Sequence, residues 1–330
     1  MIRSHGPRAL ATVLDAVRPE IVILGRPMFD GFIDAVQKRG IPLVIEANED
    51  LVRVSRSIMR HGVTPRAQLI AAVDSLVVGR MQRRNYPRAD QVLVCSPVEA
   101  QVLHRAARVH RIAVVPNVVS AVVGDTATEE IRALGFLGSY GYAPNEAAAI
   151  ELMDEVLPRV VALGGPKQAV LIGRDPTPRM ERSASTHPGV RITGEVPDVF
   201  AELRAAGLLV VPLRSGAGTR VKILEAAAAG IPIVSTPFGV EGLALRDGIE
   251  VLLATDPDDL ARAVMRLHAD PSLRRRLAGA ARQAVERTYS IEAGRAAVRA
   301  ALEPLTSRVD SLRAARRDSL IPETSTERAQ

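Results

Sequence analysis

The sequence predicts an α/β protein with two doubly wound parallel sheets, the N-terminal one incomplete. Short runs rich in Val, Ile and Leu alternate with longer helical patterns along almost the whole chain. Within each run the apolar residues are continuous rather than alternating, which is typical of strands that helices cover on both faces. The series lapses into a polar stretch at residues 118–130 and then restarts with a strand, so we place a domain boundary there.

Residues 1–120 are expected to form the incomplete N-terminal domain, which begins with a helix-like segment. The runs that predict its strands are EIVILG at 20–25, IPLVIEA at 41–47, QVLVCS at 91–96 and IAVVPN at 112–117. Residues 131–290 are expected to form the second domain. Its predicted strands are ALGFLGS at 133–139, AVLIG at 169–173, VRITG at 190–194, LLVVPL at 208–213, IPIVST at 231–236 and EVLLAT at 250–255. Residues 291–330 are expected to form a C-terminal helix and a tail that frays from about Ser307, where the apolar periodicity ends.

The composition limits the class of protein. With 330 residues, of which 47% are hydrophobic, the chain is long enough for two full cores. Aromatic residues make up only 3% and Trp is absent, which argues against stacking platforms for carbohydrate polymers or single-stranded nucleic acid. The single cysteine, Cys95, allows no internal disulfide and lies in an apolar run, so we expect a reducing, cytoplasmic compartment.

The basic balance of the chain does not indicate a nucleic-acid partner. The net charge is +6, but the arginines are scattered among acidic residues rather than gathered in a binding stripe. Two local clusters, Arg80–Arg88 and Arg274–Arg276, are interpreted either as solvated surface or as peripheral contacts to anionic lipid at the inner face of a membrane. No run reaches the roughly 18–20 apolar residues of a membrane span, so we expect a soluble or at most peripheral protein.

One stretch, LRSGAGTRVKILEAAAAG at 213–230, combines features of an anion-binding site. RSGAGT is expected to form the turn at the carboxyl end of a buried strand, and VKILEAAAAG a helix closed by Gly230. Ligands of open α/β sheets lie at such strand ends, and the amides at a helix N-terminus favour anions. Gly216 and Gly218 allow a ligand to approach the backbone, while Thr219 is expected to cap the helix or to bind a phosphate oxygen.

Lys222 and Glu225 are three residues apart in this helix and therefore share one face. A nucleoside diphosphate laid along that face would place its phosphates near the amides and Lys222, and its ribose hydroxyls near Glu225. Ala226–Ala229 would let the helix lie tightly against the sheet. The alternative is a surface ion pair on an ordinary strand–turn–helix unit. Only three of the 43 basic residues are lysines, so a lysine at this turn favours the binding site.

Several motifs of the second domain occur in the order of a known family. They are GSYGYAPN at 138–145, LIGRDPTP at 171–178, ITGEVPDV at 192–199, the segment 211–243 and TYS at 288–290. Together they resemble the donor-binding domain of GT-B glycosyltransferases, in particular the retaining family 4 group. A weaker resemblance from Ile41 to Val119, through QVLVCSPVEAQVL and VVPNVV, extends to the acceptor domain of that family.

This resemblance implies two Rossmann-like domains and a nucleotide-activated sugar as donor. It also implies transfer with retention, without a metal or other cofactor, to an acceptor that is a glycan, a lipid-linked molecule or a small molecule. Amides, Lys and Arg would stabilise the charge that builds on the departing β-phosphate. The six histidines are dispersed and suggest no metal site.

The resemblance assigns roles to single residues as well. Glu225 matches the second glutamate of the family's Glu-x7-Glu motif, which holds the donor ribose, whereas Ala217 stands in place of the first. The pyrophosphate would be bound by Arg214, Arg220 or Lys222. The expected catalytic residues are therefore Arg214, Lys222 and Glu225.

The donor-binding residues are expected in the loops that follow four of the strands. They are Gly138, Ser139, Gly173, Arg174, Gly194, Glu195, Val196, Gly216, Ala217, Gly218, Thr219 and Arg220. In the family the loop matching 194–196 borders the nucleobase, and a plain strand-end turn is the alternative interpretation of these three residues.

The acceptor side departs from the family pattern. Members often carry an acidic-x-His-Asp motif where this chain reads EANED at 46–50. Asn48, Glu49 and Asp50 are the candidates to position an acceptor, or else they cap the next helix. An acceptor domain of this fold normally starts with a strand and a glycine-rich turn, so about half of it is expected to be absent. Three explanations stay open: a start assigned too late, a short form completed by a partner chain, or a degenerate protein that no longer transfers sugar.

A glycosyltransferase is thus the expected function. Two alternatives stay open: a non-catalytic subunit that binds nucleotide sugar, and a sugar-nucleotide epimerase of the same fold. The expected partners are a nucleoside diphosphate sugar and a glycan or lipid-linked acceptor.

Overall fold

The computed structural model describes residues 2–25, 30–47, 52–53, 55, 59, 65–120, 130–216 and 218–318 of the chain. The chain divides into two compact units. The first comprises Met1–Asn48, Leu76–Val115 and Ala296–Gln330, and the second comprises Glu49–Ser75 and Pro116–Arg295. The C-terminal segment, which the sequence predicts as a separate piece, is therefore part of the N-terminal unit.

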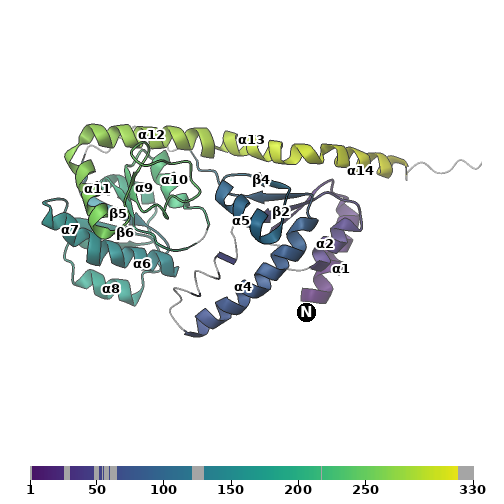
Figure 1. Ribbon diagram of the computed structural model, residues 1–330, viewed down its shortest axis with the longest axis horizontal. Coiled ribbons are helices and arrows are strands. Elements are labelled where there is room, and N and C mark those ends of the chain that lie inside the picture. The colour runs from purple at the N-terminus through teal and green to yellow at the C-terminus, as the bar shows by residue number, and fades with distance from the viewer. Residues whose placement is uncertain are drawn as a thin grey trace, which may run out of the picture. The chain divides into compact units, whose positions relative to one another are not determined.

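Within the described residues, the first unit contains a parallel sheet of four strands in the order β1-β2-β3-β4 (Figure 1). The predicted strands of this part of the chain are confirmed as β1 (Val22–Gly25), β2 (Leu43–Ala47), β3 (Gln91–Val94) and β4 (Ile112–Val114). The helices between and before them are α1 (Ile2–Val17), α2 (Asp30–Gln37), α4 (Pro65–Asn85) and α5 (Pro97–Ala107), with the 3-10 turn η1 (Tyr86–Arg88) after α4. The part of α4 up to Ser75 belongs to the second unit.

The burial of this sheet follows the strand order. The central strands β2 and β3 are almost wholly buried, which is why their sequences are continuously apolar. The edge strand β1 is only partly covered, and Ile23 is 52% exposed. One edge of the sheet therefore presents an apolar strand whose outer side has no neighbouring strand among the described residues.

The C-terminal segment packs on this sheet as α13 (Ile291–Leu302), the 3-10 turn η3 (Glu303–Leu305) and α14 (Thr306–Asp318). Ala301 and Leu305 share a buried cluster with Val44 of β2 and Leu93 of β3. The prediction that the chain frays from about Ser307 is wrong for the residues described. A sparse helical period of apolar residues continues through this arginine-rich segment and anchors it: Leu302, Leu305, Val309 and Leu312.

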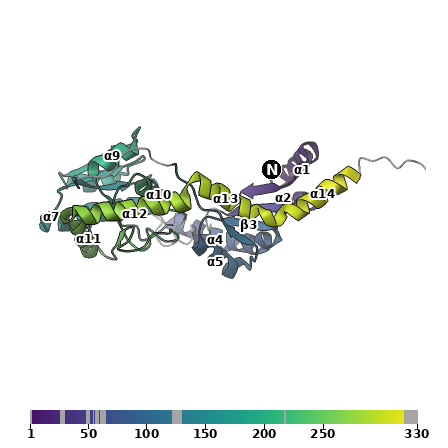
Figure 2. The same ribbon diagram turned by 90° about the horizontal axis from the view of Figure 1, so that it is seen from above.

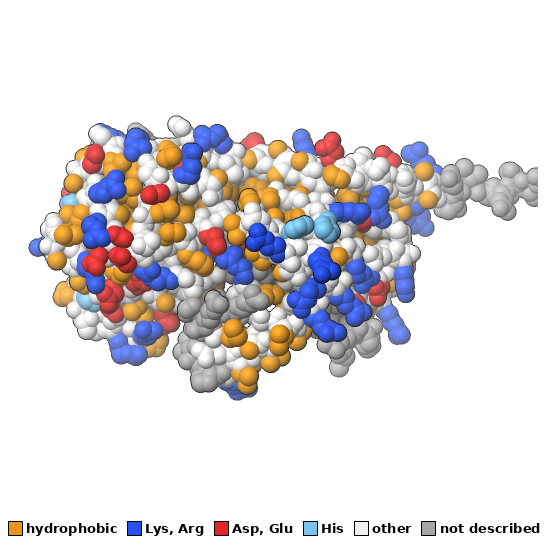
Figure 3. Space-filling view, viewed as in Figure 1, with side chains coloured by type: hydrophobic (Ala, Val, Ile, Leu, Met, Phe, Trp, Pro, Cys, Tyr) orange, Lys and Arg blue, Asp and Glu red, His pale blue; other side chains and the backbone are white. Residues whose placement is uncertain are grey.

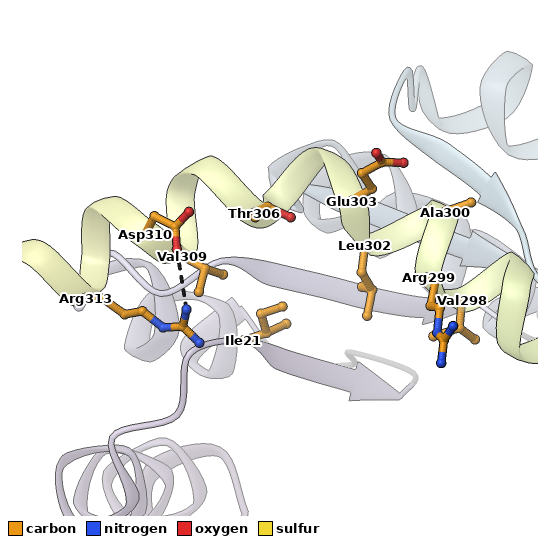
Figure 4. Close-up of a pocket in the computed structure, with 10 residues that line it drawn as sticks. All are labelled: Ile21, Val298, Arg299, Ala300, Leu302, Glu303, Thr306, Val309, Asp310 and Arg313. Atoms are coloured by element: carbon orange, nitrogen blue, oxygen red, sulfur yellow. Dashed lines mark hydrogen bonds and ion pairs between the residues drawn. The ribbon is translucent and has the colours of Figure 1, made fainter.

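A groove of about 610 Å³ lies in the first unit between Ile21, just before β1, and the helices α13 and α14 (Figure 4). Val298, Leu302 and Val309 supply most of its apolar lining. At one end Arg313 forms a two-pronged ion pair with Glu20, at 2.6 and 2.7 Å.

The described part of the second unit holds a parallel sheet of six strands in the order β10-β9-β8-β5-β6-β7. The predicted strands are again confirmed, as β5 (Ala133–Leu137), β6 (Gln168–Ile172), β7 (Val190–Gly194), β8 (Leu209–Val211), β9 (Ile233–Ser235) and β10 (Leu252–Leu253). β5 is the first strand of this sheet along the chain and lies between β6 and β8, so the direction of winding reverses there. Ligands of open α/β sheets bind at such a switch point.

Helices cover both faces of this sheet. Figure 1 shows α6 (Ala143–Glu151), α7 (Leu157–Ala162) and α8 (Pro178–Ser185) on one side, and α9 (Val199–Ala206), α10 (Val221–Ala228) and α12 (Pro271–Tyr289) on the other. The π turn η2 (Leu152–Val156) links α6 to α7, and α11 (Pro257–Ala269) precedes α12. α10 and α12 pack against each other (Figure 2). The predicted parallel α/β architecture is thus confirmed.

Two details of the second unit concern sequence predictions. The alanines of α10 are buried, and Gly230 follows the helix with φ +67°, so the predicted tight packing and C-terminal glycine are both confirmed. By contrast, Arg274 of the basic cluster 274–276 is buried, and its guanidinium donates to the carbonyl oxygen of Leu267 at 2.6 Å. Arg274 is therefore a structural residue and cannot contact lipid headgroups. In the described part of the chain no helix is long and apolar enough to cross a bilayer.

Candidate functional site

The loops that follow β5, β6 and β7 are joined at the switch-point edge of the second sheet. The Gly138 N–H donates to the carbonyl oxygen of Ile172 at 3.0 Å, and the Gly173 N–H donates to that of Gly194 at 3.1 Å. The structure therefore brings the predicted residues Gly138, Gly173 and Gly194 together. Main-chain atoms, not side chains, form this part of the site.

Glycine is required at the contact between the first two loops. Gly173 has φ +139°, and a Cβ atom there would lie 1.8 Å from the carbonyl oxygen of Gly138. Gly216, in the loop after β8, has φ +124°, and a Cβ atom there would lie 3.1 Å from the hydroxyl of Tyr142. These glycines let the loops on either side of the switch point approach each other closely.

Two helix N-termini follow these loops. α6 starts at Ala143, directly after the loop that leaves β5, and α10 starts at Val221, after the loop that leaves β8. The first amides of a helix carry partial positive charge and have no partner within the helix, so this edge of the sheet favours an anion.

Lys222, in the first turn of α10, connects the two sides of the switch point. Its Nζ donates to Oδ1 of Asn145 at 2.8 Å and lies 4.5 Å from the centre of the Phe136 ring. Asn145 Nδ2 in turn donates to the carbonyl oxygen of Ser139 at 2.9 Å. Burial, with a smaller contribution from the charge of Arg220, lowers the pKa of Lys222 to about 7. The ammonium is thus held in place at a high electrostatic cost.

Glu225 lies one turn further along the same helix and is partly exposed. Burial raises the pKa of its carboxyl, and the neighbouring Lys222 opposes that shift. The alternative of a surface ion pair does not describe this pair, because Lys222 bonds to Asn145 and lies over an aromatic ring. Lys222 and Glu225 thus lie one turn apart on α10, as the sequence predicts.

Arg220 shapes the loop before α10. Its guanidinium lies 4.5 Å from the centre of the Phe238 ring and donates to the carbonyl oxygen of Gly218. Arg220 itself is the residue that caps α10, without a side-chain capping bond, so the prediction that Thr219 caps the helix is wrong. The alternative role of Thr219, binding a phosphate oxygen, stays a prediction.

Arg214 is engaged with protein groups. Its guanidinium forms a two-pronged ion pair with Glu151 of α6, with bonds of 2.6 to 3.0 Å, and donates to the carbonyl oxygen of Thr255 at 2.6 Å. These bonds, chiefly the one to Glu151, raise the pKa of Arg214. Arg214 thus holds the loop after β8 against α6, a role that competes with its predicted role in catalysis.

A paired comparison of Arg214 and Glu151 separates these roles. If Arg214 has only a structural role, Arg214→Ala and Glu151→Gln should each lower the free energy of unfolding by about 1 kcal/mol, because the ion pair is partly exposed. Both variants are then expected to change nucleotide affinity by similar factors, as measured by calorimetry. A large affinity loss in Arg214→Ala alone would show that the guanidinium binds the ligand directly.

The other predicted residues fall into two groups. Ser139 and Arg174 lie in the joined loops, where Ser139 Oγ donates to Asp175 Oδ2 at 3.2 Å. Glu195 and Val196 follow Gly194, with Glu195 exposed. The remaining four candidates lie outside the described residues: Asn48, Glu49, Asp50 and Ala217. Among the residues that are described, no group of three or more His, Cys, Asp or Glu side chains could hold a metal ion.

Three residues of the site are missing from the sequence predictions: Phe136, Tyr142 and Asn145. Tyr142 and Asn145 belong to the motif GSYGYAPN, and their place at the start of α6, the first helix after the switch-point strand, was the available signal. No local pattern marks Phe136 as more than a buried strand residue.

The fold and the site define the class of the second unit, a parallel α/β domain with two helix N-termini at its switch point. Residues 131–270 match the model of the family Glycosyl transferases group 1. This part of the chain is therefore similar to the group 1 glycosyltransferases, in line with the resemblance of its motifs.

Two curated relatives show how far the likeness extends. The chain is 30% identical over 159 residues to a phosphatidyl-myo-inositol mannosyltransferase of Mycobacterium leprae (strain TN), over 46% of this chain and 41% of that protein. It is 40% identical over 86 residues to a D-inositol 3-phosphate glycosyltransferase of Streptomyces bingchenggensis (strain BCW-1), over 26% of this chain and 19% of that protein. The chain thus spans less than half the length of the curated relatives it matches.

The fold has solved counterparts. The crystal structure of Anabaena HepE in complex with UDP and glucose matches with a TM-score of 0.64 at 14% identity, over 92% of this chain and 83% of that chain. Such a likeness concerns the fold, and it confirms the predicted GT-B type of two Rossmann-like domains.

Proposed function

We propose that the chain is a glycosyltransferase that takes a sugar from a nucleoside diphosphate sugar. The observation that carries this proposal is the ammonium of Lys222, held at the switch point by Asn145. A buried ammonium whose pKa is lowered to about 7 gains strongly from an anion that enters the site. The group 1 family match and the HepE complex with UDP favour a nucleoside diphosphate as that anion.

In the proposed reaction the bond from the sugar's anomeric carbon to the β-phosphate oxygen breaks, and the acceptor hydroxyl oxygen bonds to that carbon. The acceptor proton passes to the departing phosphate. Lys222 and the amides at the start of α6 and α10 would stabilise the charge that develops on this phosphate, more in the transition state than before it. We propose transfer with retention and without a metal, because these protein groups supply the positive charge.

The proposed acceptor is a hydroxyl of a lipid-linked or soluble polyol or glycan. The two curated relatives are named for transfer involving a phosphatidyl-myo-inositol and a D-inositol 3-phosphate.

We also propose a partner chain that completes the N-terminal domain by adding a strand beside β1. The exposed Ile23 of this edge strand and the apolar groove beside Ile21 would accommodate that strand.

Calorimetry with UDP, GDP and ADP, followed by nucleotide release from the matching sugar nucleotides, tests the proposal. We expect one of the three nucleotides to bind. The matching sugar nucleotide should release its nucleoside diphosphate when an acceptor is added. Binding without release would instead favour a nucleotide-sugar-binding subunit. An isomerised sugar nucleotide as sole product would favour an epimerase. If none of the nucleotides binds, the proposed site is wrong.

The substitution Glu225→Gln tests the ribose contact. We expect an affinity loss of about tenfold for the nucleotide, because the neutral amide removes the charge that strengthens the hydrogen bond from the ribose hydroxyl. The 2′-deoxy and 3′-deoxy nucleotides serve as matched probes. The analogue that lacks the contacted hydroxyl should lose much more affinity for wild type than for Glu225→Gln. If both deoxy penalties persist unchanged in the variant, Glu225 does not hold the ribose.

The affinity for the sugar nucleotide is expected to fall as the pH rises from 7 to 9. Lys222 has a pKa of about 7 in the free protein, and a bound diphosphate raises it. Below pH 7 the lysine is protonated in both states, so this group causes no change. Above pH 7 binding requires proton uptake, which weakens affinity by up to about tenfold per pH unit until the bound-state pKa is reached. Lys222→Arg, whose guanidinium stays charged, should show a flat profile in the same titrations.

A further inference from the structure

Charged side chains of the second unit often lie beside charges of the opposite sign. Figure 3 shows basic and acidic side chains close together on the face of this unit that it presents. One such pair is Arg214 with Glu151, at 2.6 Å. Lys222 differs, because its Nζ donates to Oδ1 of the neutral Asn145 at 2.8 Å. The acceptor beside this cation is thus an amide and not a carboxylate.

A second hydrogen bond fixes the orientation of the Asn145 amide. Its Nδ2 donates to the carbonyl oxygen of Ser139 at 2.9 Å, and a carbonyl oxygen can only accept. The amide oxygen must therefore face Lys222. An aspartate at this position could also accept from Lys222, but its other oxygen would face the carbonyl oxygen of Ser139. The main chain of the loop after β5 thus favours the neutral side chain.

The start of α6 is built around this amide. The Asn145 N–H donates to the carbonyl oxygen of Tyr142 at 2.8 Å, which fixes the residue in the first turn of the helix. Gly138 leaves the space for its side chain, since a Cβ atom at 138 would lie 3.0 Å from Cγ and Nδ2 of Asn145. The glycine after β5 therefore admits the residue that contacts Lys222.

The charges around Lys222 make the neutral acceptor significant. Within the described part of the chain, Glu225 on the same helix raises the pKa of Lys222, and Arg220 in the preceding loop lowers it. β5 presents the Phe136 ring and α6 presents the Asn145 amide, and both are uncharged. A carboxylate at the place of this amide would cancel much of the positive charge that an anionic ligand would otherwise meet.

We propose that Asn145 is a positioning residue that holds the ammonium of Lys222 at the donor diphosphate and leaves its positive charge uncompensated. The inference rests on the proposed function, because the diphosphate is that of the sugar nucleotide. It extends that function by making a neutral side chain responsible for the charge of the site. The amide accepts a hydrogen bond as a carboxylate does, but it adds no negative charge.

The titration of Lys222 tests this role without any ligand. Lysine labelled with carbon-13 at Cε gives signals for Lys38, Lys167 and Lys222, and the signal lost in Lys222→Met is that of Lys222. We expect Asn145→Asp to move the midpoint of the Lys222 titration up by at least about one pH unit, because it adds a negative charge. Asn145→Leu should move the midpoint down, because it removes the acceptor.

These two variants separate the charge from the fold. Both keep the branched shape of Asn145 and both lose the bond to Ser139, so their melting temperatures should fall by similar amounts. Gln168→Glu is the matched control, since it adds the same charge at the exposed start of β6, and it should leave the midpoint unchanged. Midpoints that move in the same direction in the two Asn145 variants would overturn the proposal. If Asn145→Asp does not fold, an unchanged or higher midpoint in Asn145→Leu would do the same.

Nucleotide affinity at pH 7 is measured by calorimetry with whichever of UDP, GDP and ADP binds wild type. Asn145→Asp should weaken binding by at least about tenfold although Lys222 stays protonated, because the new carboxylate repels the diphosphate. Gln168→Glu should bind like wild type. Wild-type affinity in Asn145→Asp would overturn the proposal. If wild type binds none of the nucleotides, the proposed function is refuted, and the titration still decides whether Asn145 sets the charge of Lys222.

Discussion

The substitution Lys222→Met is expected to lower turnover of the sugar nucleotide by about 10² to 10³-fold while the protein stays folded. Methionine can keep the apolar contact with Phe136, but it removes the charge that we propose to stabilise the departing phosphate. Because burial lowers the pKa of Lys222, the fold disfavours its charged form. The thermal midpoint of Lys222→Met should therefore equal or exceed that of wild type. Initial rates of nucleotide release and a melting curve measure both quantities.

The chain offers a matched control for this result. Lys167, the residue before β6, is exposed, and Lys167→Met should leave both turnover and melting unchanged. Lys222→Arg retains charge but places a larger group over Phe136, so partial activity is expected. Wild-type turnover in Lys222→Met would contradict the assigned role. A sharp fall in its melting temperature would mean that the lysine is mainly a structural residue.

The strands could be predicted because of how they are buried. Central strands such as β2, β3 and β8 are covered on both faces, so their sequences are continuous apolar runs. α14 was misjudged for the opposite reason. It touches the first sheet along one narrow side, and a few apolar residues among many arginines suffice for that contact.

The site could be predicted only where one local segment contains the chemistry. The strand, glycine-rich turn and helix around Lys222 and Glu225 are contiguous, so their shared face follows from helix geometry. Side-chain partners are not contiguous. Asn145 lies 77 residues before Lys222, and Glu151 lies 63 residues before Arg214. Asn145 was therefore not predicted as a member of the site. Arg214 was predicted to bind a phosphate because its distant ion-pair partner, Glu151, could not be identified from the sequence.

The largest effect on stability is expected from Gly173→Ala. The new Cβ atom would lie 1.8 Å from the carbonyl oxygen of Gly138, and φ is +139° there. Since the clash involves backbone, a side-chain rotation cannot relieve it. We expect a loss of at least about 4 kcal/mol in the free energy of unfolding, which corresponds to a fall of roughly 10 °C in the thermal midpoint.

Gly164→Ala isolates the steric part of that effect. Gly164 also has a positive φ of +81°, but a Cβ atom there would meet nothing within 4 Å. This variant should lose only about 1 to 2 kcal/mol, the cost of the left-handed backbone alone, and should bind nucleotide normally. Gly173→Ala, if it folds at low temperature, must separate the loops after β5 and β6, and nucleotide affinity should fall with their contact. Equal melting temperatures for the two variants would show that the loops tolerate separation, and would remove close backbone packing as the reason why these glycines stand at the switch point.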